Sequence, residues 1–163
     1  MSELAPGTKA PTFSLPALDG SGTVDGPVRG PLTLLLFAKA SCPTCRWAMP
    51  IFRTLHERAT DTGLSVLGVF QDDPDVERAA AAELGVTFPV GLEGRPWPTA
   101  EAYGLTTVPT FFLLDADGEV LVTSPGFSRE DLLEAPKRAA ELDGGEAVDP
   151  FPEEMDVPAY RPG

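Results

Sequence analysis

Residues 32–50 read LTLLLFAKASCPTCRWAMP, a stretch in which a strand, a loop and the start of a helix are each recognisable. The continuous apolar run over residues 32–37 predicts a strand that is buried on both faces of a sheet. The motif Cys42-Pro43-Thr44-Cys45 then opens a segment that extends to about Thr62. Apolar residues lie along one helical face of that segment, namely Trp47, Ile51, Leu55 and Ala59. The stretch therefore predicts a helix that begins with two cysteines directly after a buried strand.

The two cysteines, which are the only ones in the chain, indicate dithiol chemistry. Unpaired backbone N–H groups and the positive end of the helix dipole favour a thiolate at a helix start, so Cys42 is the predicted nucleophile. Cys45 lies in the same turn, within reach of Cys42. The predicted reaction is attack of the Cys42 thiolate on a substrate disulfide, followed by attack of Cys45 on the mixed disulfide.

Other uses of a cysteine pair fit the sequence less well. A structural zinc site takes four ligands, whereas this chain offers two cysteines and a single histidine, His56, so we expect no metal site and no cofactor. A disulfide between such close neighbours would stabilise the fold little. Two inert buried thiols remain an open interpretation, although they would not need this position at the start of a helix.

The flanking sequence predicts strands and helices that alternate around a central sheet. Thr12 to Val28 reads as a short hairpin that extends this sheet. A helix is expected from Asp73-Pro74 to Gly85, and another from Ser128, in which Pro136 should introduce a kink or a break. Further strands are predicted over residues 64–70, 88–92, 109–114 and 120–122, and a short helix over residues 98–103.

The composition changes near the carboxyl end. We expect a domain over residues 1–142, followed by an acidic, proline- and glycine-rich segment over residues 143–163. That segment is either a disordered tail or an extended arm. Its large side chains, Phe151, Met155 and Tyr160, favour an arm that packs on the domain.

The charge of the chain excludes some classes of partner. Its 163 residues include 25 acidic and 12 basic side chains, which gives a net charge of -13. A chain this negative repels nucleic acid and anionic membrane surfaces, so we expect neither as a partner. The sequence shows neither a signal peptide nor an apolar run long enough to span a bilayer, and a cytoplasmic location is expected.

The strand, the Cys-Pro-Thr-Cys motif and the helix together resemble the thioredoxin superfamily. Pro50 falls where thioredoxins kink the active-site helix, and Val108-Pro109 resembles the family's cis-proline loop. Gly126 lies where the family keeps a glycine beside the substrate groove. The resemblance covers about Ala10 to Leu142. The N-terminal hairpin of the chain and a βα-type insertion over residues 71–104 are similar to the TlpA-type and peroxiredoxin-like (redoxin) branch of the superfamily.

This resemblance implies an α/β, thioredoxin-like fold with a central mixed sheet flanked by helices. It also implies that Val108, Pro109 and Gly126 bind the substrate, with the Val108 backbone pairing with an incoming peptide as an added strand. The implied partners are a protein disulfide substrate or a redox partner protein.

Several positions depart from the family pattern. Ser41 replaces the usual tryptophan before the first cysteine, and Leu36 and Ala48 stand where acidic residues are found in thioredoxins and in TlpA-type proteins. A buried carboxylate would help to deprotonate Cys45, so the residues expected for the usual proton relay are missing at these two positions. Lys39 and Arg46 instead bring positive charge near the dithiol, where they either favour the Cys42 thiolate or remain solvated surface charges.

The leading functional hypothesis is a thiol-disulfide oxidoreductase that reduces protein disulfides or relays electrons. A thiol peroxidase of the peroxiredoxin type is an alternative, but the threonine expected three residues before its reactive cysteine is replaced by Lys39. A non-catalytic metal-binding module of thioredoxin fold is a further alternative. It would need a wider cysteine spacing and a distant histidine, which this sequence lacks.

Overall fold

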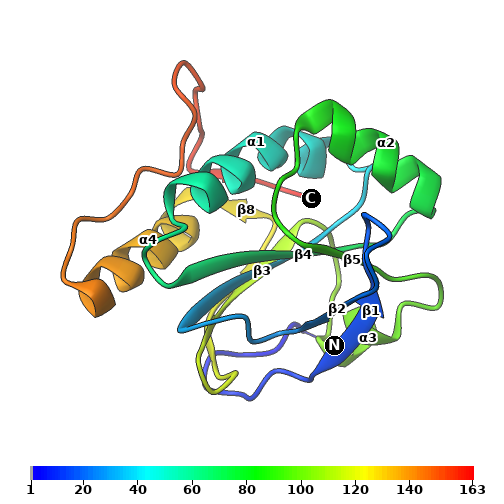
Figure 1. The fold of residues 1–163 in the computed structure, drawn as a ribbon, viewed down its shortest axis with the longest axis horizontal. Coiled ribbons are helices and arrows are strands. Elements are labelled where there is room, and N and C mark those ends of the chain that lie inside the picture. Colours follow the sequence, from blue (N-terminus) through cyan, green and yellow to red (C-terminus); the bar gives the residue numbers. More distant parts are fainter. Residues whose placement is uncertain (1) are drawn as a thin grey trace.

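The computed structural model describes residues 2–163; Met1, which opens the predicted domain of residues 1–142, lies outside the described residues. The centre of the molecule is a mixed sheet with the strand order β5-β4-β3-β6-β7 (Figure 1). Strands β3, β4 and β5 pair in parallel, whereas β6 pairs antiparallel with both β3 and β7. The predicted α/β fold with a central mixed sheet is confirmed. The strands of this sheet are β3 (Leu32–Ala38), β4 (Leu64–Phe70), β5 (Val90–Leu92), β6 (Thr110–Asp115) and β7 (Val120–Pro125).

Strand β3 is buried along its whole length, as its apolar run predicts. It has a neighbouring strand on each edge, and its side chains enter a different core on each face of the sheet. Leu34 and Leu36 pack in the core beneath helices, whereas Leu35 and Phe37 pack in the core on the opposite face. A strand with two cores and two partners has no solvent-facing side, which explains the absence of polar alternation in its sequence.

Helices cover both faces of the sheet. They are α1 (Pro43–Arg58), α2 (Pro74–Leu84), α3 (Pro98–Ala102) and α4 (Arg129–Asp143). Helices α1 and α4 lie on one face, and α3 lies on the other (Figure 1). Helix α1 ends before the predicted Thr62, because the hydroxyls of Thr60 and Thr62 bond to nearby backbone carbonyls and hold a turn. Within residues 2–163, no helix is both long enough and apolar enough to cross a membrane.

The N-terminal hairpin, β1 (Phe13–Pro16) and β2 (Thr23–Gly26), forms as predicted but does not extend the central sheet. It is a separate two-stranded sheet, which an isolated bridge from Ala17 to Gly91 connects to β5. Val24 is buried in the second core, and the Phe13 ring packs edge-on against Tyr103 at 6.4 Å. The apolar side chains of the hairpin therefore cover a face of the sheet with α3, and this packing is favoured over continuation of the sheet edge.

Helix α4 is continuous from Arg129 to Asp143, so of the kink or break predicted at Pro136 the break is wrong and the kink stays a prediction. Pro136 lies on the buried side of the helix, between the buried residues Leu132 and Ala139. A proline inside a helix removes one backbone hydrogen bond, and packing of the buried face against the core compensates for that loss. The start of the helix follows the prediction, because the Ser128 hydroxyl accepts a hydrogen bond from the backbone N–H of Asp131 at 3.2 Å.

The segment after α4 is an extended arm that returns across the molecule (Figure 1). Phe151 and Met155 pack against the core beneath α1. The Arg58 guanidinium donates hydrogen bonds to the carbonyls of Asp149 at 2.9 Å and Phe151 at 3.3 Å. Near its end the arm forms β9 (Tyr160–Arg161), which pairs antiparallel with β8 (Phe127–Ser128).

We expect Leu35→Ala to lower the free energy of unfolding by about 2–5 kcal/mol, because Leu35 is fully buried and its truncation leaves a cavity. Leu142→Ala is the matched control, since Leu142 is 64% exposed, and its effect should stay within about 0.5 kcal/mol. Urea denaturation followed by circular dichroism measures both. Equal destabilisation by the two substitutions would contradict the central position of β3.

Candidate active site

Cys42 is the N-cap residue of α1, and this position defines the chemistry of its sulfur. The backbone of Cys42 is extended (φ -91°, ψ 116°), and its Sγ accepts a hydrogen bond from the backbone N–H of Cys45 at 3.2 Å. The first turn of α1 contains no acidic side chain. A negative sulfur at this point receives an amide hydrogen bond and lies at the positive end of the helix dipole. The predicted placement of Cys42 at the helix start is confirmed.

Cys45 has a different environment, although both cysteines are free thiols. It is almost fully buried in the first turn of α1. Burial raises the pKa of the Cys45 thiol, and its hydrogen bond with Cys42 and the negative charges of Cys42 and Glu77 raise that pKa further. Cys45 therefore carries its proton at neutral pH, whereas the half-buried Cys42 is the more accessible sulfur.

Glu77 is a residue of the site that the sequence analysis missed. It lies in the first turn of α2, is 1% exposed, and accepts hydrogen bonds from the backbone N–H groups of Ala40 at 3.1 Å and Asp72 at 3.0 Å. Burial raises the pKa of the Glu77 carboxyl, against the lowering effect of those two hydrogen bonds. A buried carboxylate is thus present near the dithiol, although Leu36 replaces the acid that thioredoxins carry on the strand. The sequence did contain a signal for this position. Glu77 precedes Ala80 and Ala81 by three and four residues, the helical spacing that places all three on the buried face of α2.

The structure brings the predicted substrate-binding residues together beside Cys42. The Cys42 thiol donates a hydrogen bond to the Val108 carbonyl at 3.5 Å. The Val108–Pro109 peptide bond is cis, and the Pro109 carbonyl accepts a hydrogen bond from the backbone N–H of Gly126 at 2.8 Å. Val108, Pro109 and Gly126 therefore form one surface next to the Cys42 sulfur, and their role in binding substrate stays a prediction.

Lys39 and Arg46 lie near the dithiol in the sequence, but their charged groups contact residues other than the two cysteines. The Lys39 ammonium lies 4.1 Å from the centre of the Trp97 ring. The Arg46 guanidinium forms an ion pair with Glu83 on α2 and a hydrogen bond with the Ala40 carbonyl at 3.4 Å. The predicted effect of these two cations on the Cys42 thiolate stays a prediction.

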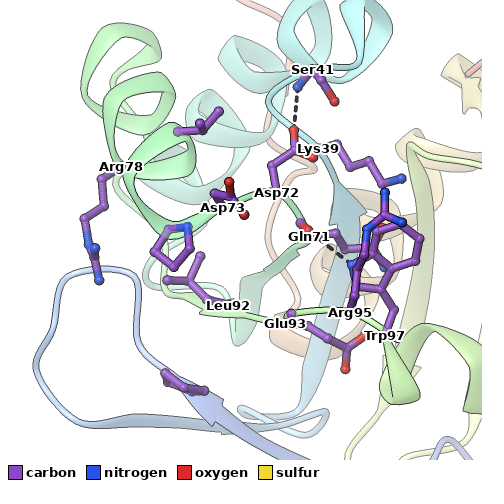
Figure 2. A pocket seen from close by; sticks show the side chains of 14 residues that line it. Lys39, Ser41, Gln71, Asp72, Asp73, Arg78, Leu92, Glu93, Arg95 and Trp97 are labelled. Atoms are coloured by element: carbon purple, nitrogen blue, oxygen red, sulfur yellow. Dashed lines mark hydrogen bonds between the residues drawn. The ribbon is translucent and has the colours of Figure 1, made fainter.

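A hollow of about 890 Å³ lies beside Ser41, between α2 and the loop that carries Trp97 (Figure 2). The Ser41 backbone N–H donates to the Asp72 carboxylate at 2.8 Å, and the Trp97 indole N–H donates to the Gln71 carbonyl at 3.2 Å. Figure 2 shows Lys39 and Arg95 beside the Trp97 ring, from which the Arg95 guanidinium is 4.8 Å distant. The hollow gives solvent and small molecules space next to the loop that precedes Cys42.

Comparisons with known proteins agree with this geometry. The model of the AhpC/TSA family matches residues 6–123, well over half of the chain. Thiol-disulfide oxidoreductase ResA from Geobacillus thermodenitrificans is 31% identical over 131 residues, which cover 79% of this chain and 75% of that protein. A candidate peroxiredoxin from Mycobacterium tuberculosis is 32% identical over 133 residues, which cover 74% of this chain and 85% of that protein.

The solved structures give the same result. The crystal structure of a candidate thiol:disulfide interchange protein DsbE from Chlorobium tepidum superposes with a TM-score of 0.74 at 28% identity. The match covers 87% of this chain and 99% of that chain. The fold is that of the thioredoxin superfamily, as the resemblance implied.

We expect Glu77→Gln to lower the pKa of Cys45, because the substitution removes one of the negative charges that raise it. The comparison is made in a Cys42→Ser background, in which Cys45 is the only thiol, by following its alkylation rate against pH. The midpoint of that profile should shift to lower pH. Glu83→Gln on the same helix is the control and should leave the midpoint in place; an equal midpoint for both variants would argue against an electrostatic effect of Glu77.

Proposed function

Since the chain belongs to the AhpC/TSA family and is a thiol-disulfide oxidoreductase, we propose that it acts through a mixed disulfide on Cys42. In this proposal it either reduces protein disulfides or relays electrons to a redox partner protein. One observation carries the proposal. Cys42 is the N-cap of α1, and its sulfur accepts a hydrogen bond from the backbone N–H of Cys45 at 3.2 Å. The same sulfur lies 3.5 Å from the carbonyl oxygen of Val108. A nucleophile is thus held between an amide donor and a backbone edge suited to an extended peptide.

The reaction proceeds in two exchanges. The Cys42 thiolate attacks one sulfur of the substrate disulfide, a Cys42–substrate disulfide forms, and the departing substrate thiolate takes up a proton. The Cys45 thiol then loses its proton and attacks Cys42 Sγ, which releases the second substrate sulfur as a thiol. Two electrons pass from the dithiol to the substrate, and the chain is left with a Cys42–Cys45 disulfide.

As part of this proposal, Glu77, whose negative charge acts on the Cys45 thiol, receives the Cys45 proton in the second exchange, directly or through a water molecule. Burial raises the pKa values of both groups, so a proton can pass between them at a smaller cost than between a buried thiol and an ordinary surface carboxylate. The two hydrogen bonds from Ala40 and Asp72 hold the carboxylate in place. Glu77 thereby takes the role of the acid that is missing at Leu36 and Ala48.

A thiol peroxidase is the second candidate, and the 32% identity to a candidate peroxiredoxin is the observation that favours it. Lys39 stands where such an enzyme carries a threonine to orient peroxide, and Lys39 is directed to Trp97. Turnover of hydrogen peroxide that exceeds turnover of a protein disulfide, at equal concentrations, would favour this candidate over the oxidoreductase.

We expect Cys45→Ser to trap substrate and Cys42→Ser to abolish exchange, because only Cys42 can form the mixed disulfide and only Cys45 can resolve it. Incubation with a disulfide-containing protein followed by non-reducing electrophoresis and mass spectrometry measures both. The adduct should map to Cys42 and disappear with dithiothreitol. An adduct of equal yield on Cys45 in the Cys42→Ser chain would reverse the assignment of the two roles.

A cytoplasmic location is part of the proposal, because a chain whose two cysteines form a single Cys-x-x-Cys pair is typical of redox proteins of a reducing compartment. For a reductant of that compartment we expect a Cys42–Cys45 potential below about -230 mV, measured by titration against glutathione. A value near about -120 mV would instead describe a disulfide donor. The Cys42→Ser chain, which lacks the couple, is the control.

A further inference from the structure

The end of the C-terminal arm lies beside the dithiol. The backbone N–H of Arg129 donates to the Ala159 carbonyl at 2.9 Å, and β9 then pairs with β8 in the register Phe127↔Arg161 and Ser128↔Tyr160. Figure 1 shows this red segment passing β8 and reaching the start of α1. The arm thus adds an antiparallel strand to a backbone edge next to the site.

The arm also bonds to the residues around the cysteines. Thr44, between Cys42 and Cys45, donates its hydroxyl hydrogen to the Pro162 carbonyl at 2.7 Å and accepts a hydrogen bond from Arg161 Nε at 3.1 Å. The Arg161 guanidinium stacks 4.9 Å from the centre of the Trp47 ring. Thr44 and Trp47 have no part in the exchange chemistry, and these contacts give both a function.

The remaining contacts of the arm fall on the predicted substrate-binding residues. Gly126 has a left-handed backbone (φ +74°), and a Cβ there would overlap the Tyr160 hydroxyl. A Cβ on Gly163 would overlap the Val108 carbonyl in the same way. Residues 159–163 therefore fill the space between Val108 and Gly126.

We infer that residues 159–163 occupy the polypeptide-binding surface of this enzyme, which consists of the β8 edge, Thr44, Trp47 and Val108, and that a protein substrate enters by displacing them. The inference rests on the proposed function for the reaction at Cys42. The partner it identifies is an extended peptide segment that pairs with β8 and places an arginine or lysine side chain on the Trp47 ring.

Displacement is feasible because the ladder between β8 and β9 has two residue pairs and Tyr160 is 55% exposed. The arm is nevertheless tethered, so its effective concentration at the site is in the range of about millimolar for a short flexible connection. A substrate must compete with that concentration. Its apparent Kd is the intrinsic Kd divided by the fraction of molecules in which the arm has left the surface. Weakening the arm should therefore lower KM.

The test compares the unaltered chain with Arg161→Ala and with Lys137→Ala, a control on the exposed surface of α4. Arg161→Ala should raise the rate of Cys42 alkylation by iodoacetamide, and lower KM for a disulfide-containing protein, by about tenfold, since it removes a stacked cation and a hydrogen bond. Lys137→Ala should change neither quantity. The free peptide VPAYRPG should inhibit the Arg161→Ala chain, whereas the same peptide with alanine in place of its arginine should not.

The outcomes separate this inference from the proposed function. Faster alkylation without any disulfide reduction would support the binding surface and overturn the function. Disulfide reduction with equal KM and equal alkylation rates in all three chains would support the function and overturn the binding surface.

If the Arg161→Ala variant does not fold, a measurement on the unaltered chain still tests the inference. Excess VPAYRPG should increase hydrogen exchange at residues 159–161 of the chain, because the free peptide takes their place on β8. Unchanged exchange at peptide concentrations well above millimolar would overturn the inference.

Discussion

The hydrogen bond from the Cys45 backbone N–H to the Cys42 sulfur is the interaction on which the rest of the site depends. It forms because a cysteine occupies the N-cap of α1, a position that usually carries an oxygen-bearing side chain. The helix starts there because β3 ends at Ala38, and both cores of the sheet fix β3 in place. The position of the reactive sulfur is therefore set by the burial of a strand that contributes no chemistry itself.

The two cysteines have different proposed roles because their surroundings differ. Cys42 is half-buried and faces an amide donor, whereas Cys45 is buried with a raised pKa and an acidic neighbour in Glu77. A dithiol with two equivalent sulfurs would have no preferred order of attack. In the proposed exchange the environment of each sulfur sets the order in which the two sulfurs react, and a carboxylate from another helix belongs to that environment.

Local sequence patterns predict those parts of the molecule that depend on neighbours in the chain. The apolar run of β3, the cysteines at the start of α1, and the limits of α2 at Asp73 and Gly85 all follow from short-range preferences. Helical spacing could have placed Glu77 on the buried stripe of α2, but not beside the dithiol, because its partner Ala40 is 37 residues distant in the sequence. The hairpin shows the same limit: alternation predicts that β1 and β2 pair, but only the shape of the second core decides where they lie.

The contacts of the two tryptophans have a consequence for spectroscopy. Trp47 lies beneath Arg161 and edge-on to Phe127 at 5.0 Å, whereas Trp97 lies beside Lys39 and Arg95 at the hollow next to Ser41. Indole fluorescence responds to nearby charges, and each ring here has cations that belong to a different part of the site. The chain contains no other tryptophan. Its tryptophan emission thus arises entirely from two positions, one beside the arm and one beside the hollow, and the unlabelled protein carries its own optical probes of what enters there.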